Sequence, residues 1–247
     1  MVGAPREERP DLDAERKAMN FVTILENIVK LTVKYWDKFL ITGLSYTLAL
    51  AAITVGVGAV LGSLIALMRM SKIPPLRWIA VVYTEIIRGT PMLLQLYVFY
   101  FALPQLIPFL NRKQFLCVAI ALVCNSAAYV SEIIRSGIQA VDIGQTEAAR
   151  SLGMSQKLTM TQIILPQAIK NILPALGNEF IMIIKDTSLA STFFIGDLMT
   201  QSLLVKGKTY LTMEPLIMVA IIYFVLTFGL SKLLAVFERR LRRGDIR

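Results

Sequence analysis

The amino-acid sequence predicts an all-α integral membrane protein with about five transmembrane helices. Hydrophobic residues make up 55% of its 247 residues, and the mean hydropathy is +0.62. A soluble domain of this length rarely reaches such a value, because it needs more polar surface. The apolar residues also gather in uncharged runs. The run between Lys38 and Arg69 is longer than the roughly 20 residues that a helix needs to cross a bilayer.

Residues 1–38 are predicted to form a polar tail followed by an amphipathic helix on the membrane surface. Residues 1–19 are rich in charge and proline, so we expect disorder there. Apolar side chains then recur at helical spacing, and Tyr35 and Trp36 would lie at the level of the lipid headgroups. The alternative is an ordinary packed helix. The N-terminus has no apolar signal-peptide segment, so we expect no cleavage.

The transmembrane domain is predicted to cover residues 39–240, and its first span is expected at about 39–68. Within this span, Gly58 and Gly62 form a pair of small residues four apart, which lets another helix pack closely. A short loop with three basic residues and two prolines follows and should face the cytoplasm. The basic residues of this loop are Arg69, Lys72 and Arg77.

Four further apolar segments, three of which contain a charge-free run, predict the other spans. The second contains Gly89-Thr90-Pro91, a triplet that should bend or break its helix. The fourth is weakly apolar and should face protein or water rather than lipid. Residues 187–213 hold two apolar pieces that are too short to span, so we expect an external hairpin or a re-entrant segment. The four spans are expected at about 79–110, 114–134, 163–184 and 215–237.

The distribution of basic residues predicts the orientation. The formal net charge is +9, but the cations lie at the ends of apolar runs without interleaved aromatic residues, so we expect no nucleic-acid partner. Five arginines, from Arg239 to Arg247, place the C-terminal end and the basic tail 241–247 in the cytoplasm. Five spans then leave the N-terminus outside, with residues 69–77 and 135–162 inside.

The residue types exclude several kinds of chemistry. The sequence contains no histidine, which excludes a His-based catalytic triad and a His-ligated metal site. Cys117 and Cys124 lie in one apolar run and are expected to be packing residues. No phosphate-binding G-x-x-x-x-G-K-[ST] loop is present, so we expect no catalytic residue, metal or cofactor in this chain. Uphill transport would then need an ion gradient or a separate ATPase.

Residues 140–160 contain the parts of a short cytoplasmic helix. Asp142 can cap its N-terminus, with Gln145 three residues later as in a capping box. Gly153 supplies a left-handed stop, and Ser155 can cap the next helix.

The charges and alanines of the same segment are also suited to a docking helix. Glu147 lies in the early turns and Arg150 near the C-terminal end, where the helix dipole favours them. Ala148 and Ala149 leave one side flat, so another protein surface could lie close to it. The alternative is an ordinary connector helix.

This segment resembles the EAA loop of ABC import permeases. Glu147-Ala148-Ala149 is followed after three residues by Gly153, and after nine more by Ile163-x-Leu165-Pro166, which matches at every position. The resemblance implies that the short helix docks in a groove of the ATPase subunit and carries its closure to the membrane. The residues that it assigns to ATPase coupling are Gln145, Glu147, Ala148, Ala149, Arg150 and Gly153.

Further segments resemble the permeases of polar amino-acid importers for histidine, glutamine and arginine. They fall within about residues 40–247, at 85–92, 128–135, 165–168, 185–189 and 237–247.

This resemblance implies a type I ABC importer permease in a bacterial cytoplasmic membrane. It implies an extracytoplasmic amino-acid-binding protein, two ATPase subunits that hold ATP and magnesium, and a second permease copy or a sister permease. Within the family, an opine or a sulfur amino acid is the alternative solute. An ion-coupled carrier, a channel and a membrane scaffold or sensor are the alternatives outside it, and none of them needs the EAA spacing. Five unequal spans also lack the internal repeats of many carriers.

Polar residues inside the spans are the candidates for solute contact, because the ammonium and carboxylate of an amino acid both need partners. Glu179 is the first candidate for the ammonium group or for a basic side chain. An internal ion pair is the alternative role, and for Glu85 with Arg88, one turn apart, we expect that pair. A plain channel without a solute site is also possible in this family. The candidate set is Glu179, Asn178, Asn125, Glu85 and Gln95.

Overall fold

The computed structural model describes residues 10–242, and side-chain surroundings within residues 20–241. The described part is helical throughout its regular elements and contains no strand. The predicted disorder applies to residues 1–9, which lie outside the described part, and to residues 10–19. The latter belong to the first helix, so the expectation of disorder is wrong for them.

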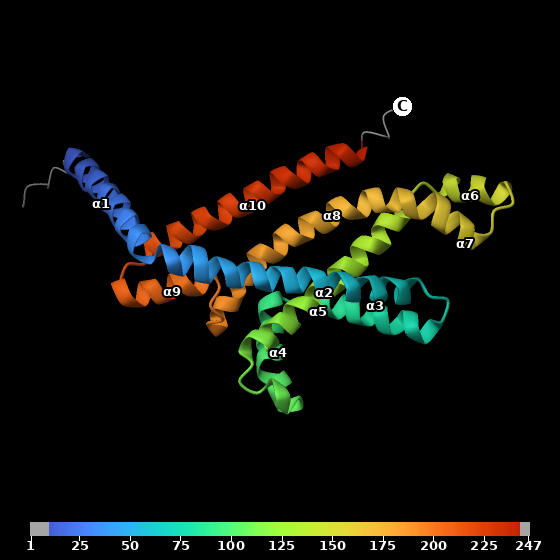
Figure 1. Cartoon of the computed structure of the whole chain (residues 1–247), viewed down its shortest axis with the longest axis horizontal. Helices are drawn as coiled ribbons and strands as arrows, with labels where there is room; N and C mark the ends of the chain where they lie inside the picture. Colours follow the sequence, from blue (N-terminus) through green and yellow to red (C-terminus); the bar gives the residue numbers. More distant parts are fainter. Residues whose placement is uncertain (1–9, 243–247) are drawn as a thin grey trace, which may run out of the picture.

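Helices follow one another with short connections. Figure 1 shows α2, α8 and α10 running lengthwise, while α4 projects to one side. Short π-helical segments lie at Asp37–Gly43 and Met160–Ile164, and 3₁₀ segments at Pro108–Leu110 and Thr187–Phe193. The α-helices are α1 (Pro10–Trp36), α2 (Leu44–Met70), α3 (Pro74–Arg88), α4 (Met92–Leu106), α5 (Gln114–Gln139), α6 (Ile143–Ser151), α7 (Gln156–Thr159), α8 (Leu165–Asp186), α9 (Leu198–Thr209) and α10 (Met213–Arg242).

Three stretches in the described part are long and apolar enough to cross a membrane, namely Asn20–Met70, Gln114–Gln139 and Met213–Leu241. Two bent pairs of helices raise the number to five if each pair forms one span, which agrees with the predicted order of the apolar segments. The first stretch has 51 residues. At about 1.5 Å per residue it is far longer than a bilayer core of about 30 Å, so only part of it can cross.

The N-terminal helix separates from the first span at a local break. Tyr35 has non-helical dihedral angles, with φ −124° and ψ 17°. The α1 helix packs against α10, and Leu31 is buried in a cluster with Met218 and Val219. The placement of α1 at the membrane surface stays a prediction.

The predicted break in the second span is confirmed. The α3 helix ends at Arg88, α4 begins after Pro91, and the two axes differ by 109°. The fourth span begins earlier than expected, because the helical path already starts at Gln156 and runs through the π segment into α8.

The α5 helix lies at the centre and packs against α2, α3, α4 and α8. Its contact with α2 needs the small residues that the sequence indicated. A Cβ added at Gly62 would lie 2.6 Å from the Val130 Cβ atom, and one at Gly58 would lie 2.7 Å from the Ser126 hydroxyl oxygen. These distances are far below van der Waals contact, so the prediction of a close helix pair is confirmed.

Residues 187–213 fold back into the protein rather than forming an exposed hairpin. Leu198 and Asp197 are fully buried. The Asp197 carboxylate caps α9 by accepting hydrogen bonds from the backbone N–H groups of Met199 and Thr200, at 3.0 and 3.4 Å. Of the two expected forms, the re-entrant one agrees with this burial.

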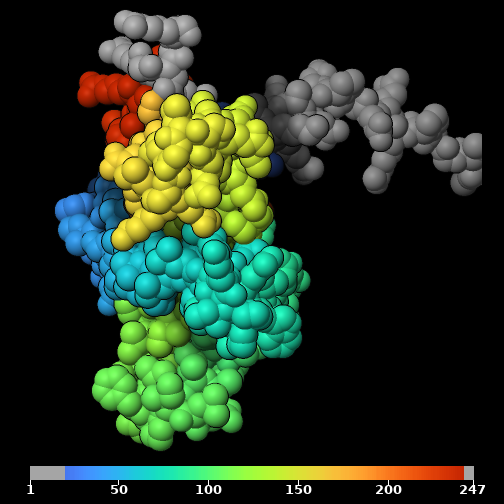
Figure 2. Space-filling model, turned by 90° about the vertical axis from the view of Figure 1, so that its right-hand side faces the viewer, coloured from blue at the N-terminus to red at the C-terminus, as the bar shows by residue number. Residues whose placement is uncertain are grey.

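The two ends of the long axis carry different elements. Figure 1 places α1 and α9 at one end, and α6, α7 and the turn between α2 and α3 at the other. The C-terminal end of α10 also extends toward the second end. Figure 2 faces that end and shows α6 and α7 in yellow above the α2–α3 turn in cyan and teal.

Candidate functional site

The α6 helix begins at a side-chain cap. The Asp142 carboxylate accepts a hydrogen bond from the Gly144 backbone N–H at 2.6 Å, which confirms the predicted N-cap. The Gln145 backbone N–H donates to the Asp142 carbonyl at 3.1 Å. Among the described residues, no hydrogen bond joins the Gln145 side chain to the Asp142 backbone, so the reciprocal half of a capping box is not formed.

The α6 helix ends in a Schellman motif around Gly153, which has a φ of +83°. The Gly153 N–H donates to the Arg150 carbonyl at 3.0 Å, and the Met154 N–H donates to the Ala149 carbonyl at 3.1 Å. Ser155 then caps α7 by accepting from the Leu158 N–H at 3.3 Å. The predicted left-handed stop and second cap are therefore confirmed.

The two alanines of α6 point in different directions. Ala149 is only 4% exposed and packs within the chain, whereas Ala148 is exposed. The expectation that both lie on a flat surface for a partner is therefore wrong for Ala149, whose small side chain instead seats α6. The other residues assigned to coupling are all exposed, namely Gln145, Glu147, Arg150 and Gly153.

Two large apolar side chains on α6 escaped the sequence analysis. Ile143 is 74% exposed and Leu152 is 84% exposed. Both lie at the ends of a short helix whose other exposed side chains are small or polar. These side chains add apolar area to the exposed surface of α6. Their position at the first turn and at the C-cap was the available signal.

A cluster of charges ties the helices that lead to α6. Glu132 on α5 forms an ion pair with Arg135, one turn along its own helix. One Glu132 oxygen also lies 2.7 Å from Arg69 Nη1 on α2 and 3.5 Å from Arg88 Nη1 at the end of α3. Arg69 is 9% exposed, so this pair is largely withdrawn from water.

The expected ion pair between Glu85 and Arg88 is not formed within the described residues. Arg88 turns to Glu132 instead, and Glu85 is exposed. The sequence pattern does not predict this role of Glu132, although Glu132 lies within the segment 128–135 that resembles the importer permeases. The available signal was an acid in a mainly apolar segment, three residues before Arg135.

Two of the predicted solute residues have a structural role. The Gln95 side chain is 6% exposed, and its Nε2 donates to the Ile87 carbonyl at 2.6 Å and to the Thr90 carbonyl at 3.1 Å. Its Oε1 accepts from Asn125 Nδ2 at 2.9 Å. The amide therefore satisfies carbonyl groups that the break between α3 and α4 leaves without helical partners, and Asn125 links this break to α5.

Two further candidates, Glu179 and Asn178, lie on α8. Glu179 is half-buried, and Asn178 is exposed beside it, on the same face as the exposed Met182 and Lys185. No ion pair involves Glu179 in the part of the chain that the structure describes. No hydrogen bond or ion pair there joins Glu179 or Asn178 to Gln95, Asn125 or Glu85. The joint role of the five candidates in solute contact stays a prediction.

The fold is that of a multi-pass helical membrane protein, with the capped helix α6 at one end. The chain belongs to the family of binding-protein-dependent transport system inner membrane components, whose model matches residues 58–243. The match contains all of α6 and the residues assigned to coupling, and it begins within α2.

Individual relatives cover most of the chain. It is 42% identical over 207 residues to the arginine transport system permease protein ArtQ of Bacillus subtilis (strain 168), covering 84% of this chain and 94% of that protein. It is 43% identical over 218 residues to the putative glutamine transport system permease protein GlnP of Rickettsia bellii (strain RML369-C), covering 88% and 99%.

A solved structure confirms the fold. The crystal structure of an amino acid ABC transporter with histidines contains a chain 48% identical to this one, with a TM-score of 0.78. The similarity covers 85% of this chain and 96% of that chain. The predicted type I ABC importer permease fold is therefore confirmed.

Proposed function

We propose that this chain is the permease subunit of an ABC importer for a polar amino acid. An extracytoplasmic binding protein delivers the solute, and separate ATPase subunits, which hold the ATP and magnesium, drive its passage. The family supports the transport role, and the relatives named for arginine and glutamine support the class of solute.

The observation that carries the proposal is the construction of α6. A helix of nine residues is too short to be stable alone in water, yet this one is capped at both ends and seated through Ala149. It nevertheless exposes Ile143, Ala148 and Leu152. A capped, partly apolar helix that projects from the molecule is suited to binding in a groove of the ATPase.

Motion of α6 has two routes into the membrane. It follows α5 after three residues, and it leads through α7 and the π segment into α8. The Glu132 cluster connects α5 with α2 and α3. A shift of α6 would therefore move α5 and α8, and the ion pairs would carry α2 and α3 along with α5.

The orientation follows from the same proposal. The end that carries α6 faces the cytoplasm, the N-terminus is outside, and the chain lies in the cytoplasmic membrane of a bacterium. Two permease subunits, either identical copies or sisters, enclose the path. The exposed apolar side chains of α2 and α10, such as Val60 and Phe224, face lipid or the second permease.

Glu179 is the proposed contact for the solute, with Asn178 beside it. Asp186 lies seven residues further along α8, on the same side of the helix, so two acids face one region. Neither acid forms an ion pair with another described residue, although Lys185 lies next to Asp186. Two acids in one region attract a cation, which favours a cationic amino acid over a neutral one. Gln95 and Asn125 instead hold the break between α3 and α4.

The coupling role can be tested with two neighbouring alanines. Ala148→Arg places a large charge on the exposed face of α6, so the permease should fold and insert but lose the rise in ATP hydrolysis when loaded binding protein is added. Ala149→Arg must bury the same charge and should reduce the amount of folded permease. Lys157→Ala, an exposed change on α7, is the control. Full stimulated hydrolysis in Ala148→Arg would exclude docking through this face.

A further inference from the structure

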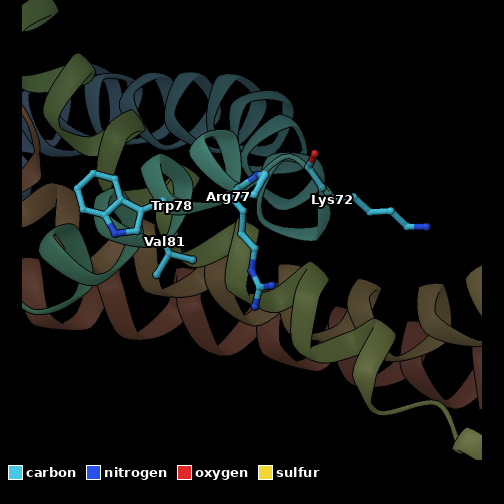
Figure 3. Close-up of a pocket in the computed structure, with 6 residues that line it drawn as sticks. Lys72, Arg77, Trp78 and Val81 are labelled. Atoms are coloured by element: carbon cyan, nitrogen blue, oxygen red, sulfur yellow. The ribbon is translucent and has the colours of Figure 1, made fainter.

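A cavity of about 380 Å³ lies at the end of the molecule that also carries α6, between the α2–α3 turn and the first turns of α3. Six residues line it, namely Ser71, Lys72, Pro74, Arg77, Trp78 and Val81. Figure 3 shows Arg77, Trp78 and Val81 on α3, with Lys72 at the opposite end of the cavity and directed outward.

The two cations of this cavity differ from their basic neighbour Arg69. Arg69 is withdrawn from water and paired with Glu132 at 2.7 Å. Lys72 and Arg77 are exposed, and neither forms an ion pair with any residue that the structure describes. Their charge is therefore available to an anion from outside the chain.

The positive charge comes from side chains and not from the end of the helix. Pro74 and Pro75, at the start of α3, have no backbone N–H to offer. The Arg77 backbone N–H donates to the Ile73 carbonyl at 3.1 Å. The Arg77 guanidinium can bind two oxygens of one phosphate group, and the flexible stem of Lys72 lets its ammonium turn inward.

An apolar surface continues from the cavity along α3. Trp78 is 68% exposed, Ile79 is 56% exposed, and Ile86, about two turns further on, is 58% exposed. Tryptophan is enriched where a membrane protein meets the headgroup region. The arrangement therefore places cations and an indole ring at headgroup level, next to a strip on which acyl chains could lie.

We propose that this cavity binds the phosphate of an anionic glycerophospholipid in the cytoplasmic leaflet, with the acyl chains along α3. Anionic lipids are attracted to basic residues at this depth. A contact with the ATPase is less suited to the site, because the exposed strip of α3 leads toward the membrane and α6 already presents the projecting surface. The inference rests on the proposed function for one point, namely that this end faces the cytoplasm.

The two tryptophans of the chain, Trp36 and Trp78, allow a direct test. The complete permease–ATPase complex is placed in phosphatidylcholine nanodiscs that contain brominated phosphatidylglycerol or brominated phosphatidylcholine. Bromine quenches indole fluorescence at contact. The signal of Trp78 is obtained as the difference between complexes with Trp36→Phe and with Trp36→Phe/Trp78→Phe.

Each cation near the surface raises the local concentration of anionic lipid roughly fivefold. With two cations at the cavity, brominated phosphatidylglycerol should therefore quench Trp78 at a mole fraction about 25-fold lower than brominated phosphatidylcholine does. Arg77→Gln should remove most of this preference, and Arg77→Lys should retain most of it. Lys157→Gln removes the same charge from α7, outside the cavity, and should change nothing.

Four results would overturn the proposal. Equal quenching by the two lipids would exclude an anionic-lipid site. If the preference for the anionic lipid survives in the double variant Arg77→Gln/Lys72→Gln, it arises from general surface charge and not from this cavity. Loss of the preference in millimolar inorganic phosphate would show that a free phosphate is the ligand. Quenching that appears only after the ATPase is removed would show a protein contact. Because the readout is independent of transport, failed uptake with preserved quenching would count against the proposed function alone.

Discussion

Gly153 shows how a single residue can determine the position of a docking element. Its φ of +83° closes the Schellman motif, and a Cβ added there would meet no atom within 4 Å. The need for glycine is therefore a backbone need and not a packing need. This position could be predicted from the sequence, because a helix that ends before a glycine and a new cap has few other conformations.

Replacement of Gly153 should separate backbone strain from side-chain bulk. Gly153→Val forces a β-branched residue into the left-handed region, at a cost on the order of 1–2 kcal/mol, and should fray or tilt α6. Gly153→Asn tolerates that region and should keep most of the activity. ATP hydrolysis with and without loaded binding protein measures the difference. Equal activity in both variants would show that the turn at Gly153 is not needed for coupling.

Glu179 shows the limit of the same reasoning. A lone acid in a weakly apolar span indicates function, but sequence alone cannot tell whether another helix supplies a partner. The structure gives it no ion pair within residues 20–241, whereas Gln95 and Asn125, chosen by the same rule, bond to each other at 2.9 Å. Hydrogen-bond partners from distant parts of the chain give Gln95 and Asn125 a structural role, and solute contact at Glu179 stays a prediction.

Glu179→Gln should impair uptake of a cationic amino acid more than uptake of a neutral one, because the volume is kept and the charge is removed. Uptake by proteoliposomes that contain the complete importer measures the effect, with co-purification of the ATPase as a check on assembly. Asn178→Ala tests the neighbouring contact. Unchanged uptake of the carried amino acid in Glu179→Gln would assign this residue to helix packing.

The helices themselves could be located from the apolar segments. Their observed ends differ from the predicted ends where a break or a π segment occurs. The predicted break at Gly89-Thr90-Pro91 was confirmed because proline and glycine act locally. Its angle and the Gln95 amide that satisfies the broken backbone depend on tertiary contacts and could not be predicted. The early start of the fourth span has the same origin, since a π segment joins α7 to α8.

The Glu132 cluster makes a prediction about how helices are held together. Glu132→Gln leaves Arg69 nearly buried without its anion, and breaking such a pair costs on the order of 3 kcal/mol. The melting temperature of the purified complex should fall by roughly 5–10 °C. Asp37→Asn breaks an ion pair with Lys38 that is about half exposed, and it should have little effect. Equal shifts in the two variants would refute a tie between α2, α3 and α5.

The whole molecule separates its functions along one axis. The α6 helix shares one end with the α2–α3 turn, whose residues line the basic cavity, and α10 extends toward that end. The α9 and α1 helices lie toward the other end. The order of apolar spans and basic loops along the chain could predict this division, because basic loops mark the cytoplasmic side of each span. The interface with the second permease, and the solute path between the two, could not be predicted, because the pattern of one sequence does not show which surfaces meet another subunit.

Two engineered cysteines can test the orientation of this axis. Ser155 follows α6 and Lys206 lies in α9, so they mark opposite ends, and both side chains are exposed. In a background with Cys117 and Cys124 replaced by alanine, Ser155→Cys should resist an impermeant thiol reagent in intact cells and react after the cells are opened. Lys206→Cys should react in both. The two variants differ only in which end of the molecule is labelled. The reverse pattern would therefore show the opposite orientation, with α6 outside the cell and inaccessible to a cytoplasmic ATPase.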